Sequence, residues 1–503
     1  MHCCPLKVPD SNASQLSNII SMLYLKDIFK NKIFGYLTTR YITYAIQFLN
    51  SIFIANNLGP FYLGIYGFIT LILSYFQQFN LGIPNSFNIL YVHHKDNDIE
   101  RNSYIINSFI LTGYLSLLVV ISYIFYFFIC MNIDQKYDID KWTFWILVMA
   151  ILHYLQTLII TIFRLKNKLG LVAICQSISV FLIFISALIF TGERIIGFII
   201  ISYIISYILC LILAIKTKII PSNNYIVSFT LQKEILKKGI ALFFYNSAFY
   251  FIIISERSII SSFYTISEFG YFTFSYTIAN AIMLSIEALA FVVFPKLVDR
   301  LSIDCNDIVN MNISQYRLYY ITSSNLLIYL AIIFFPYFLN FLPQYNDALR
   351  SAGLIALTIL MSVNFSGYSE LLLARNKERL AAYLAIFALL LNVILAIILV
   401  LVFRTKYDIV IVSTLITYLI YSLLIVYFGN KLLGINSIYE AVKICFPLRL
   451  ILPYVIAIYG CVTGSQLFTF LPLFMFVLLN YKYLKQIISF AFILLKKPNT
   501  VDL

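Results

Sequence analysis

The chain has 503 residues and a net charge of +13; 61% of the residues are apolar, 17% are aromatic and 11% are charged. A soluble globular protein is nearer half apolar and a quarter charged. Here the apolar residues come in repeated runs of about twenty, the length that crosses a hydrocarbon core of roughly 30 Å as a helix. The composition therefore indicates an all-α polytopic membrane protein, and it excludes a soluble enzyme, a nucleic-acid binder and a secreted domain.

Before the first apolar run the chain is polar, and it shows no short apolar segment with a small-residue cleavage site that would mark a signal peptide. Met22 opens a short basic segment, so translation from Met22 instead of Met1 is an alternative start. The eight cysteines have no metal-ligand spacing, and we expect neither a metal site nor a disulfide framework.

Breaking the apolar runs at charge clusters, Pro and Gly predicts about 14 transmembrane helices. Their approximate ranges are 33–56, 61–80, 103–130, 142–163, 171–190, 195–215, 240–263, 268–294, 318–342, 351–374, 380–403, 409–429, 446–463 and 467–482.

Basic residues support this count. When the loops are assigned alternately to the two sides of the membrane, most of the 35 Lys and Arg residues fall on one side, including Arg317 before the ninth span. Cytoplasmic loops carry such an excess of Lys and Arg. The pattern predicts a multi-pass membrane protein with both termini in the cytoplasm.

A shifted self-comparison sets Lys32 on Lys238, Tyr44 on Tyr250 and Gly64 on Gly270. Each unit has a basic stretch, a long helix, a tight turn and a second helix, which indicates two pseudo-symmetric six-helix lobes around a central cavity. Two C-terminal helices are then an addition. The predicted division is a cytoplasmic N-terminal segment (1–32), an N-lobe (33–215), a cytoplasmic basic linker (216–239), a C-lobe (240–429), a cytoplasmic loop (430–445), two further helices (446–482) and a basic tail (483–503).

Polar side chains inside the predicted spans are candidate functional groups, because a charged group at the bilayer centre costs about 2.5–3.5 kcal/mol on insertion scales. They fall at helical spacing on the first and seventh spans, the opening spans of the two lobes. The candidates for lining a substrate cavity are Arg40, Tyr44, Gln47, Ser51, Asn246, Tyr250, Arg257 and Asn280; those for ion coupling are Glu256, Glu287, Glu370 and His153.

Each candidate has a structural alternative. Arg257 could pair with Glu256, Glu287 or Glu370 as a link between helices, and Arg40 could reach lipid headgroups from near the membrane surface. His153 could be a hydrogen-bonded interhelical residue in place of a proton relay.

Arg40 and Arg257, the two arginines inside the predicted spans, are the best guide to the chemistry of the cargo. A guanidinium offers a fork of donors that fits phosphate oxygens, and it stays charged when desolvated. Two such groups facing one cavity suit an anionic cargo that carries phosphate, whereas a pump for lipophilic cations needs carboxylates there. Glu287 and Glu370 could supply such carboxylates, so a cation pump remains an alternative.

Short motifs recur near the turns between spans. They are Gly59-Pro60 followed by Gly64, Tyr66 and Phe68; Leu81-Gly82-Ile83-Pro84-Asn85-Ser86; Phe269-Gly270-Tyr271; and Phe294-Pro295-Lys296-Leu297. With the span count and the repeat, they resemble the bacterial O-antigen and capsule polysaccharide flippase family, part of the multidrug/oligosaccharidyl-lipid/polysaccharide exporter superfamily.

This resemblance implies two six-helix lobes in a V and alternating-access transfer of an undecaprenyl-pyrophosphate-linked oligosaccharide to the outer leaflet. It implies no cofactor, a proton or sodium ion as coupling ion, and cationic cavity residues for the pyrophosphate, for which Arg40 and Arg257 are the positions here. The implied partners are the lipid-linked oligosaccharide, membrane lipids, and a polysaccharide polymerase with its chain-length regulator, but no nucleic acid.

Two other functions remain as alternatives. The first is a cation-coupled multidrug exporter of the same superfamily. The second is a membrane-embedded glycan polymerase, although the longest outer loop, near 131–141, is too short for a catalytic domain.

Overall fold

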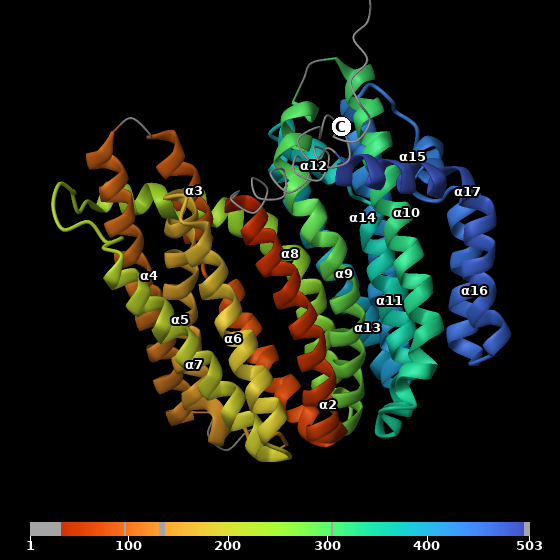
Figure 1. Ribbon diagram of the computed structural model, residues 1–503, viewed down its shortest axis with the longest axis horizontal. Helices are drawn as coiled ribbons and strands as arrows, with labels where there is room; N and C mark the ends of the chain where they lie inside the picture. The colour runs from red at the N-terminus through yellow and green to blue at the C-terminus, as the bar shows by residue number, and fades with distance from the viewer. Residues whose placement is uncertain (1–31, 95–96, 130–135, 303–304, 497–503) are drawn as a thin grey trace, which may run out of the picture.

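The computed structural model describes residues 32–94, 97–129, 136–302 and 305–496. The elements among them are all helices, which confirms the all-α class (Figure 1). The first lobe, the N-lobe, contains α2 (Lys32–Gln78), α3 (Ile83–His93), α4 (Asp98–Ile129), α5 (Asp140–Leu165), α6 (Leu169–Ile189) and α7 (Glu193–Lys216).

The second lobe, the C-lobe, follows without an intervening domain. It contains α8 (Phe229–Phe263), α9 (Ile266–Leu301), α10 (Asn306–Leu339), the 3-10 helix η1 (Pro343–Ala348), α11 (Leu349–Val363), α12 (Tyr368–Ala374), α13 (Glu378–Leu401) and α14 (Tyr407–Leu432). The chain ends with α15 (Ile438–Cys445), α16 (Leu448–Thr463) and α17 (Gln466–Lys496), at the edge of the C-lobe in Figure 1.

Each predicted span overlaps helical residues, but the ends differ, and the span 351–374 is divided between α11 and α12. Among the described residues, nine helices are long and apolar enough to cross a membrane, and up to twelve spans result if each of three bent pairs is one span. The chain is therefore a multi-pass membrane protein, while fourteen spans stay a prediction. Helix α2 holds two predicted spans, because Gly59 adopts φ 66° and Pro60 starts the second half.

The two lobes repeat one packing pattern. In the N-lobe, the first half of α2 packs on α6, α4 on α5, and α7 on both α5 and α6. In the C-lobe, α8 packs on α13, α10 on α11, and α14 on both α11 and α13. Each lobe has six helices if the two halves of α2 count as two helices and α11 with α12 counts as one. The helix pairs of the N-lobe then correspond to those of the C-lobe, as a duplicated six-helix bundle requires.

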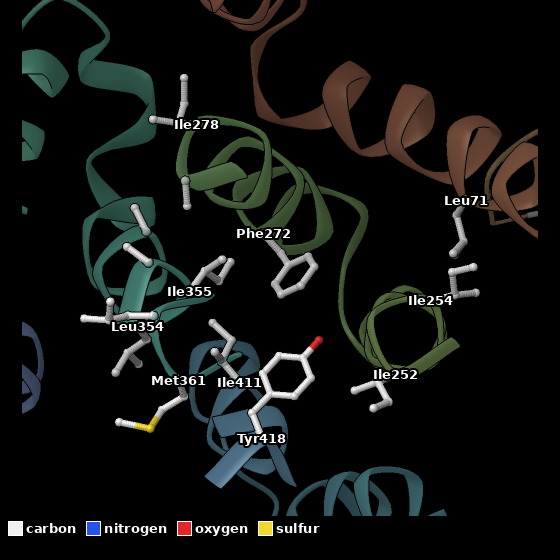
Figure 2. Close-up of a cluster of buried hydrophobic side chains, with 14 of the residues drawn as sticks. Leu71, Ile252, Ile254, Phe272, Ile278, Leu354, Ile355, Met361, Ile411 and Tyr418 are labelled. Atoms are coloured by element: carbon white, nitrogen blue, oxygen red, sulfur yellow. The ribbon is translucent and has the colours of Figure 1, made fainter. Parts of the chain in front are cut away.

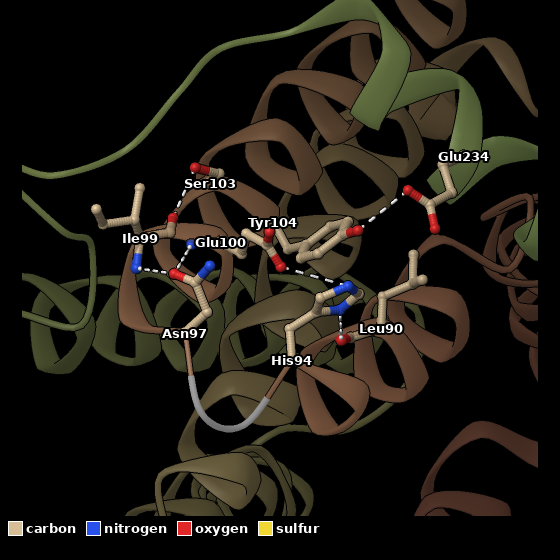
Figure 3. Close-up of polar contacts among 8 residues, drawn as sticks. All are labelled: Leu90, His94, Asn97, Ile99, Glu100, Ser103, Tyr104 and Glu234. Atoms are coloured by element: carbon tan, nitrogen blue, oxygen red, sulfur yellow. Dashed lines mark hydrogen bonds and ion pairs between the residues drawn. The ribbon is translucent and has the colours of Figure 1, made fainter.

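Helix α8 connects the lobes and bends by 62° between its segments Phe229–Phe244 and Phe249–Phe263. The first segment, which includes part of the predicted linker, lies against the N-lobe: Gln232 Nε2 donates to Asn107 Oδ1 at 3.1 Å. Figure 3 shows a second contact there, in which the Tyr104 hydroxyl donates to Glu234 Oε2 at 3.0 Å. The second segment packs in the C-lobe, so one helix belongs to both.

Figure 1 shows α3, α12 and α15 at one end of the molecule. Loops at this end carry many of the Lys and Arg residues, and we call it the basic end. Loops of different helix pairs meet there: Lys166 Nζ donates to the carbonyl of Ile219 at 3.0 Å. Burial, with repulsion from Lys168 and Arg101, lowers the pKa of the Lys166 ammonium. The other end, with the turn at Gly59, is called the opposite end.

Buried apolar side chains join the lobes in the middle of the molecule. Figure 2 shows Leu71 of α2 beside Ile254 of α8, next to a cluster in which Phe272 of α9 faces Tyr418 of α14. The core therefore continues across the boundary between the lobes.

At the opposite end the lobes touch closely, where α2 crosses α9. A Cβ atom added to Gly270 would collide with the carbonyl of Pro60, and one added to Gly64 would collide with the carbonyl of Ile266. Only glycine allows the two backbones to approach so closely.

We expect Gly270→Ala to destabilise the structure by about 1–3 kcal/mol, because the added methyl has to push one of the two backbones away. The matched control is Gly113→Ala on α4, where an added Cβ meets nothing within 4 Å. Thermal unfolding of both variants in one detergent measures the difference, and equal unfolding temperatures would contradict the close crossing.

Candidate substrate cavity between the lobes

A cavity of about 200 Å³ lies where α2, α6, α7, α8 and α9 meet. Both lobes contribute to its wall. Its polar and aromatic lining consists of Gln47, Asn50, Ser51, Tyr66, Thr70, Tyr203, Arg257, Thr273, Phe274, Tyr276 and Thr277. Three of the predicted cavity residues, Gln47, Ser51 and Arg257, are thus brought together.

Arg257 is the charged group of this lining, and it is 8% exposed. Its Nη2 donates to the carbonyl of Gly67 at 2.9 Å and to the Thr70 hydroxyl at 3.1 Å, both on α2. Its Cζ lies 5.8 Å from the ring centroid of Tyr276. Among the described side chains no carboxylate pairs with Arg257, so the pairing alternative finds no support there.

Several buried polar atoms around the cavity lack a hydrogen-bond partner among the described residues. They are Asn50 Oδ1, Arg257 Nε and Thr273 Oγ1. Buried polar groups are normally paired, and an unpaired one costs about 1–3 kcal/mol. The cavity is therefore suited to a polar occupant that offers both donors and acceptors.

Arg40 lies nearer the basic end than the cavity. It precedes Ser51 by eleven residues on one helix, which is about 16 Å of helical rise. Its Nη2 donates to the Tyr44 hydroxyl at 2.7 Å, and its Cζ lies 4.6 Å from the Tyr44 ring centroid. Arg40 and Tyr44 thus form one half-exposed unit outside the lining of the cavity.

Two of the other predicted cavity residues do not belong to the described lining of this cavity. Tyr250 is 53% exposed on α8, and Asn280 is half-buried on α9. The side chain of Asn246 lies outside the described residues, as does that of Glu287.

Glu256, a candidate for ion coupling, faces away from Arg257 into a polar cluster between α8, α13 and α14. The carboxylate is 5% exposed and accepts a hydrogen bond from the Thr414 hydroxyl. Asn392 Nδ2 donates to Thr414 Oγ1 at 2.8 Å, and the Ser255 hydroxyl donates to Asn392 Oδ1 at 3.2 Å. Glu256 Oε1 has no partner among the described residues.

The remaining coupling candidates lie apart from this cluster. Glu370 Oε2 accepts from the Gly367 backbone N at 2.5 Å and from the Ser369 hydroxyl at 2.7 Å, which caps the start of α12. His153 lies in the N-lobe, with its ring 5.9 Å from that of Tyr207 and Nε2 3.4 Å from the Thr157 hydroxyl.

Asn50, Asn392 and Thr414 are not among the candidates predicted from the sequence. Asn392 could have been found, because it is the one amide in the apolar run of the eleventh span. Thr414 lies among several hydroxyl residues of α14, and the sequence offers no signal that separates it from them.

The loop before α5 ties the N-lobe to the end of α8. Lys136 Nζ donates to the carbonyls of Ser261 and Tyr264, each at 2.6 Å, and the Tyr137 hydroxyl donates to Ser261 O at 2.8 Å. The Tyr137 ring stacks on Phe68 with centroids 4.1 Å apart. These contacts close the opposite end over the cavity.

Lys136→Ala should weaken this closure, because an ammonium at a helix C-terminus binds carbonyls that otherwise lack donors. We expect the population open at the opposite end to rise about fivefold. Distances between spin labels on the two lobes, measured by electron paramagnetic resonance, check this. Arg194→Ala, an exposed change at the same end, is the control; identical distance distributions in both variants would contradict the closure.

Solved structures with the same arrangement of helices are transporters. An inward-facing multidrug resistance MATE family transporter of the MOP superfamily gives a TM-score of 0.66 at 12% identity, covering 79% of this chain and 95% of that one. The lipid II flippase MurJ, in an inward closed conformation, gives 0.66 at 18% identity, covering 91% and 99%. A MATE protein in a straight conformation gives 0.57 at 13% identity, covering 81% and 96%.

At these identities the likeness shows the fold. No curated protein matches the sequence significantly. The family described as polysaccharide biosynthesis protein matches residues 29–299. The match covers more than half of the sequence, it confirms the family resemblance, and this chain belongs to that family.

Proposed function

We propose that the protein is a flippase that moves a lipid-linked oligosaccharide, joined to its lipid through pyrophosphate, across the membrane by alternating access. The observation that carries the proposal is Arg257: a buried guanidinium without a carboxylate partner among the described residues, in a polar cavity between two lobes. A phosphate-bearing cargo supplies the missing negative charge and the acceptors that a guanidinium fork fits.

The rest of the lining suits the sugar part. Gln47 and Asn50 offer amides, while Tyr66, Tyr203 and Tyr276 offer rings and hydroxyls. A volume of about 200 Å³ is below the roughly 300–1,000 Å³ of usual ligand pockets. An oligosaccharide therefore requires the lobes to separate, as alternating access supposes, while the lipid tail stays in the bilayer.

Arg40 and Arg257 are proposed to act in sequence. On α2 the lining residues Gln47 and Ser51 lie about 10 and 16 Å of helical rise beyond Arg40, which is further than a pyrophosphate extends, so the two arginines are proposed to bind it one after the other. Arg40, half-exposed and nearer the basic end, meets the charge first. Arg257 then receives it in the cavity.

The Glu256 cluster is the proposed coupling site. A buried carboxylate without a cationic partner has to be neutralised by a proton or a bound cation. The carboxylate, the Asn392 amide and the Thr414 hydroxyl provide the oxygen atoms that a hard cation such as sodium prefers. Helices α8, α13 and α14 meet here, so occupancy of the site can bias the packing of the C-lobe.

A reconstitution experiment tests the function. Liposomes with the purified protein receive a polyprenyl-pyrophosphate oligosaccharide on one leaflet, and a glycosidase outside the vesicles reports its transfer. We expect transfer of this lipid, and little of a glycolipid with the same sugars but no phosphate. Equal rates for both lipids, or rates no higher than in protein-free vesicles, would contradict the proposal.

An exporter of organic cations is the second candidate, because Glu256 is a buried carboxylate and MATE proteins share the fold. It requires export that depends on Glu256 or Glu370 and is indifferent to Arg257. Efflux of a fluorescent cation from cells that produce each variant distinguishes the two functions.

We further propose that the protein lies in the bacterial inner membrane with the basic end in the cytoplasm, since cytoplasmic loops are enriched in Lys and Arg. Its proposed partners are a polysaccharide polymerase and a chain-length regulator. Labelling of cysteines placed at the two ends in intact cells tests the orientation.

A further inference from the structure

A second cavity, of about 930 Å³, lies at the basic end of the C-lobe between α10, α12, α15, α16 and α17. Its lining shares no residue with that of the cavity between the lobes. Among the described residues, its lining contains the cations Arg317, Lys443 and Arg449 and one acidic residue, Glu440.

Arg449 stands in the first turn of α16 and is held against α17. Its Cζ lies 3.9 Å from the ring centroid of Tyr483, and its carbonyl accepts a hydrogen bond from Asn480 Nδ2 at 3.2 Å. The Nη1 atom is buried and has no acceptor among the described residues. A guanidinium oriented by an aromatic ring, with a donor to spare, is prepared for an anion.

The other charges leave this cavity positive. Glu440 is paired with Lys443 at 3.9 Å. Arg317 is 6% exposed and donates to the carbonyls of Ser366 at 2.8 Å and Ile444 at 3.3 Å. These carbonyls satisfy its donors without cancelling its charge. An anionic ligand near Arg449 therefore experiences two cations, Arg449 and Arg317, of which Arg317 also interacts electrostatically with the Glu370 carboxylate outside the lining.

The lining also changes along the membrane normal. On α10, Asn310 and Ser314 lie near the helix start at the basic end, and Leu318 and Ile321 follow one to two turns deeper. On α17, which runs the other way, Ser489 is nearer the end than Tyr483. Met311 and Thr322 depart from this order, but the α10 lining is mostly polar near the basic end and includes Leu318 and Ile321 deeper, which suits a phospholipid with a polar head group and apolar chains.

We propose that this cavity binds an anionic glycerophospholipid, with its phosphate on Arg449 and its acyl chains along Leu318 and Ile321. The lipid is separate from the cargo and occupies the junction of α10 with α16 and α17. It therefore fixes the two C-terminal helices to the C-lobe.

Native mass spectrometry of the delipidated full chain tests the site, with phosphatidylglycerol and phosphatidylcholine of equal chain length as probes. We expect phosphatidylglycerol to bind about tenfold more tightly than phosphatidylcholine, and Arg449→Ala to remove the difference, since a hydrogen bond to a charged group is lost. Lys431→Ala, an exposed change at the basic end outside the cavity, should keep it. Equal binding of phosphatidylglycerol by Arg449→Ala and the unchanged protein would overturn the proposal.

Thermal unfolding provides a second measurement that includes Arg449→Lys and Tyr483→Ala. Lysine retains the charge and should keep part of the stabilisation by phosphatidylglycerol, while loss of the Tyr483 ring should weaken it with the arginine present. If inorganic phosphate stabilises the protein as much as the lipid does, the site takes free phosphate and the lipid assignment is wrong. If Arg449→Ala fails to fold, an unchanged lipid effect in both other variants overturns it.

Discussion

Arg257→Ala is expected to reduce transfer of the pyrophosphate-linked oligosaccharide by about a hundredfold, because two or more charge-assisted hydrogen bonds to the cargo are lost. Arg257→Lys should recover a part of the activity, since an ammonium keeps the charge without the planar fork. The vesicle assay with the glycosidase outside measures both rates.

Folding has to be separated from transport in this test. Arg257 also bonds to Gly67 and Thr70 across the lobes, so its loss can loosen the closed form. The control is Arg379→Ala, an exposed arginine at the start of α13. Elution as a single monodisperse species and an unchanged helical signal show that the variants are folded.

Arg40→Ala is expected to slow transfer less, because Arg40 lies outside the lining of the cavity. Normal transfer by both arginine variants would remove the roles assigned to them.

Glu256→Gln is the second change with a large expected effect. The amide keeps the shape of the side chain and can still accept from Thr414, but it cannot lose a proton or balance a cation. We expect transfer driven by an ion gradient to fall about tenfold or more, to the rate seen without a gradient.

Separate proton and sodium gradients across the vesicle membrane identify the ion. Asn392→Ala should weaken a sodium effect, because an oxygen atom of the cluster is removed, and should matter less for a proton. Glu378→Gln, at the start of α13, is the matched control. Undiminished gradient dependence in Glu256→Gln would exclude Glu256 as the coupling group.

Much of the helical plan follows from hydropathy, because a segment in lipid has to satisfy its own backbone hydrogen bonds and be apolar outside. Helix ends do not follow in the same way. Helix α10 begins at Asn306, well before the apolar run, since a helix can continue into water. The break between α11 and α12 was missed as well; it depends on Gly367, with φ 89°, and on the cap from Glu370.

The positions of some candidate residues also follow from the sequence, while those of others do not. The polar stripe on the first span places Gln47 and Ser51 at the cavity, because spacing along a helix fixes a face. Spacing does not fix depth or partner: Arg40 lies outside the lining, and Arg317, which charge sorting assigns to a loop, is buried inside the C-lobe. Which carbonyls surround a guanidinium depends on contacts between distant helices, and one sequence contains no such information.

Under the proposed function, the bonds from Arg257 to α2 also affect the carrier when no cargo is bound. The Nη2 donor held by Gly67 and Thr70 is one that a phosphate needs, so the backbone of α2 acts as an internal competitor for the cargo. Binding of the cargo and separation of the lobes then occur in one step, in which phosphate oxygens replace the Gly67 and Thr70 oxygens as acceptors for Arg257. In the proposed cycle, the empty carrier forms these bonds again, and this limits cycling without cargo that would dissipate the proposed ion gradient.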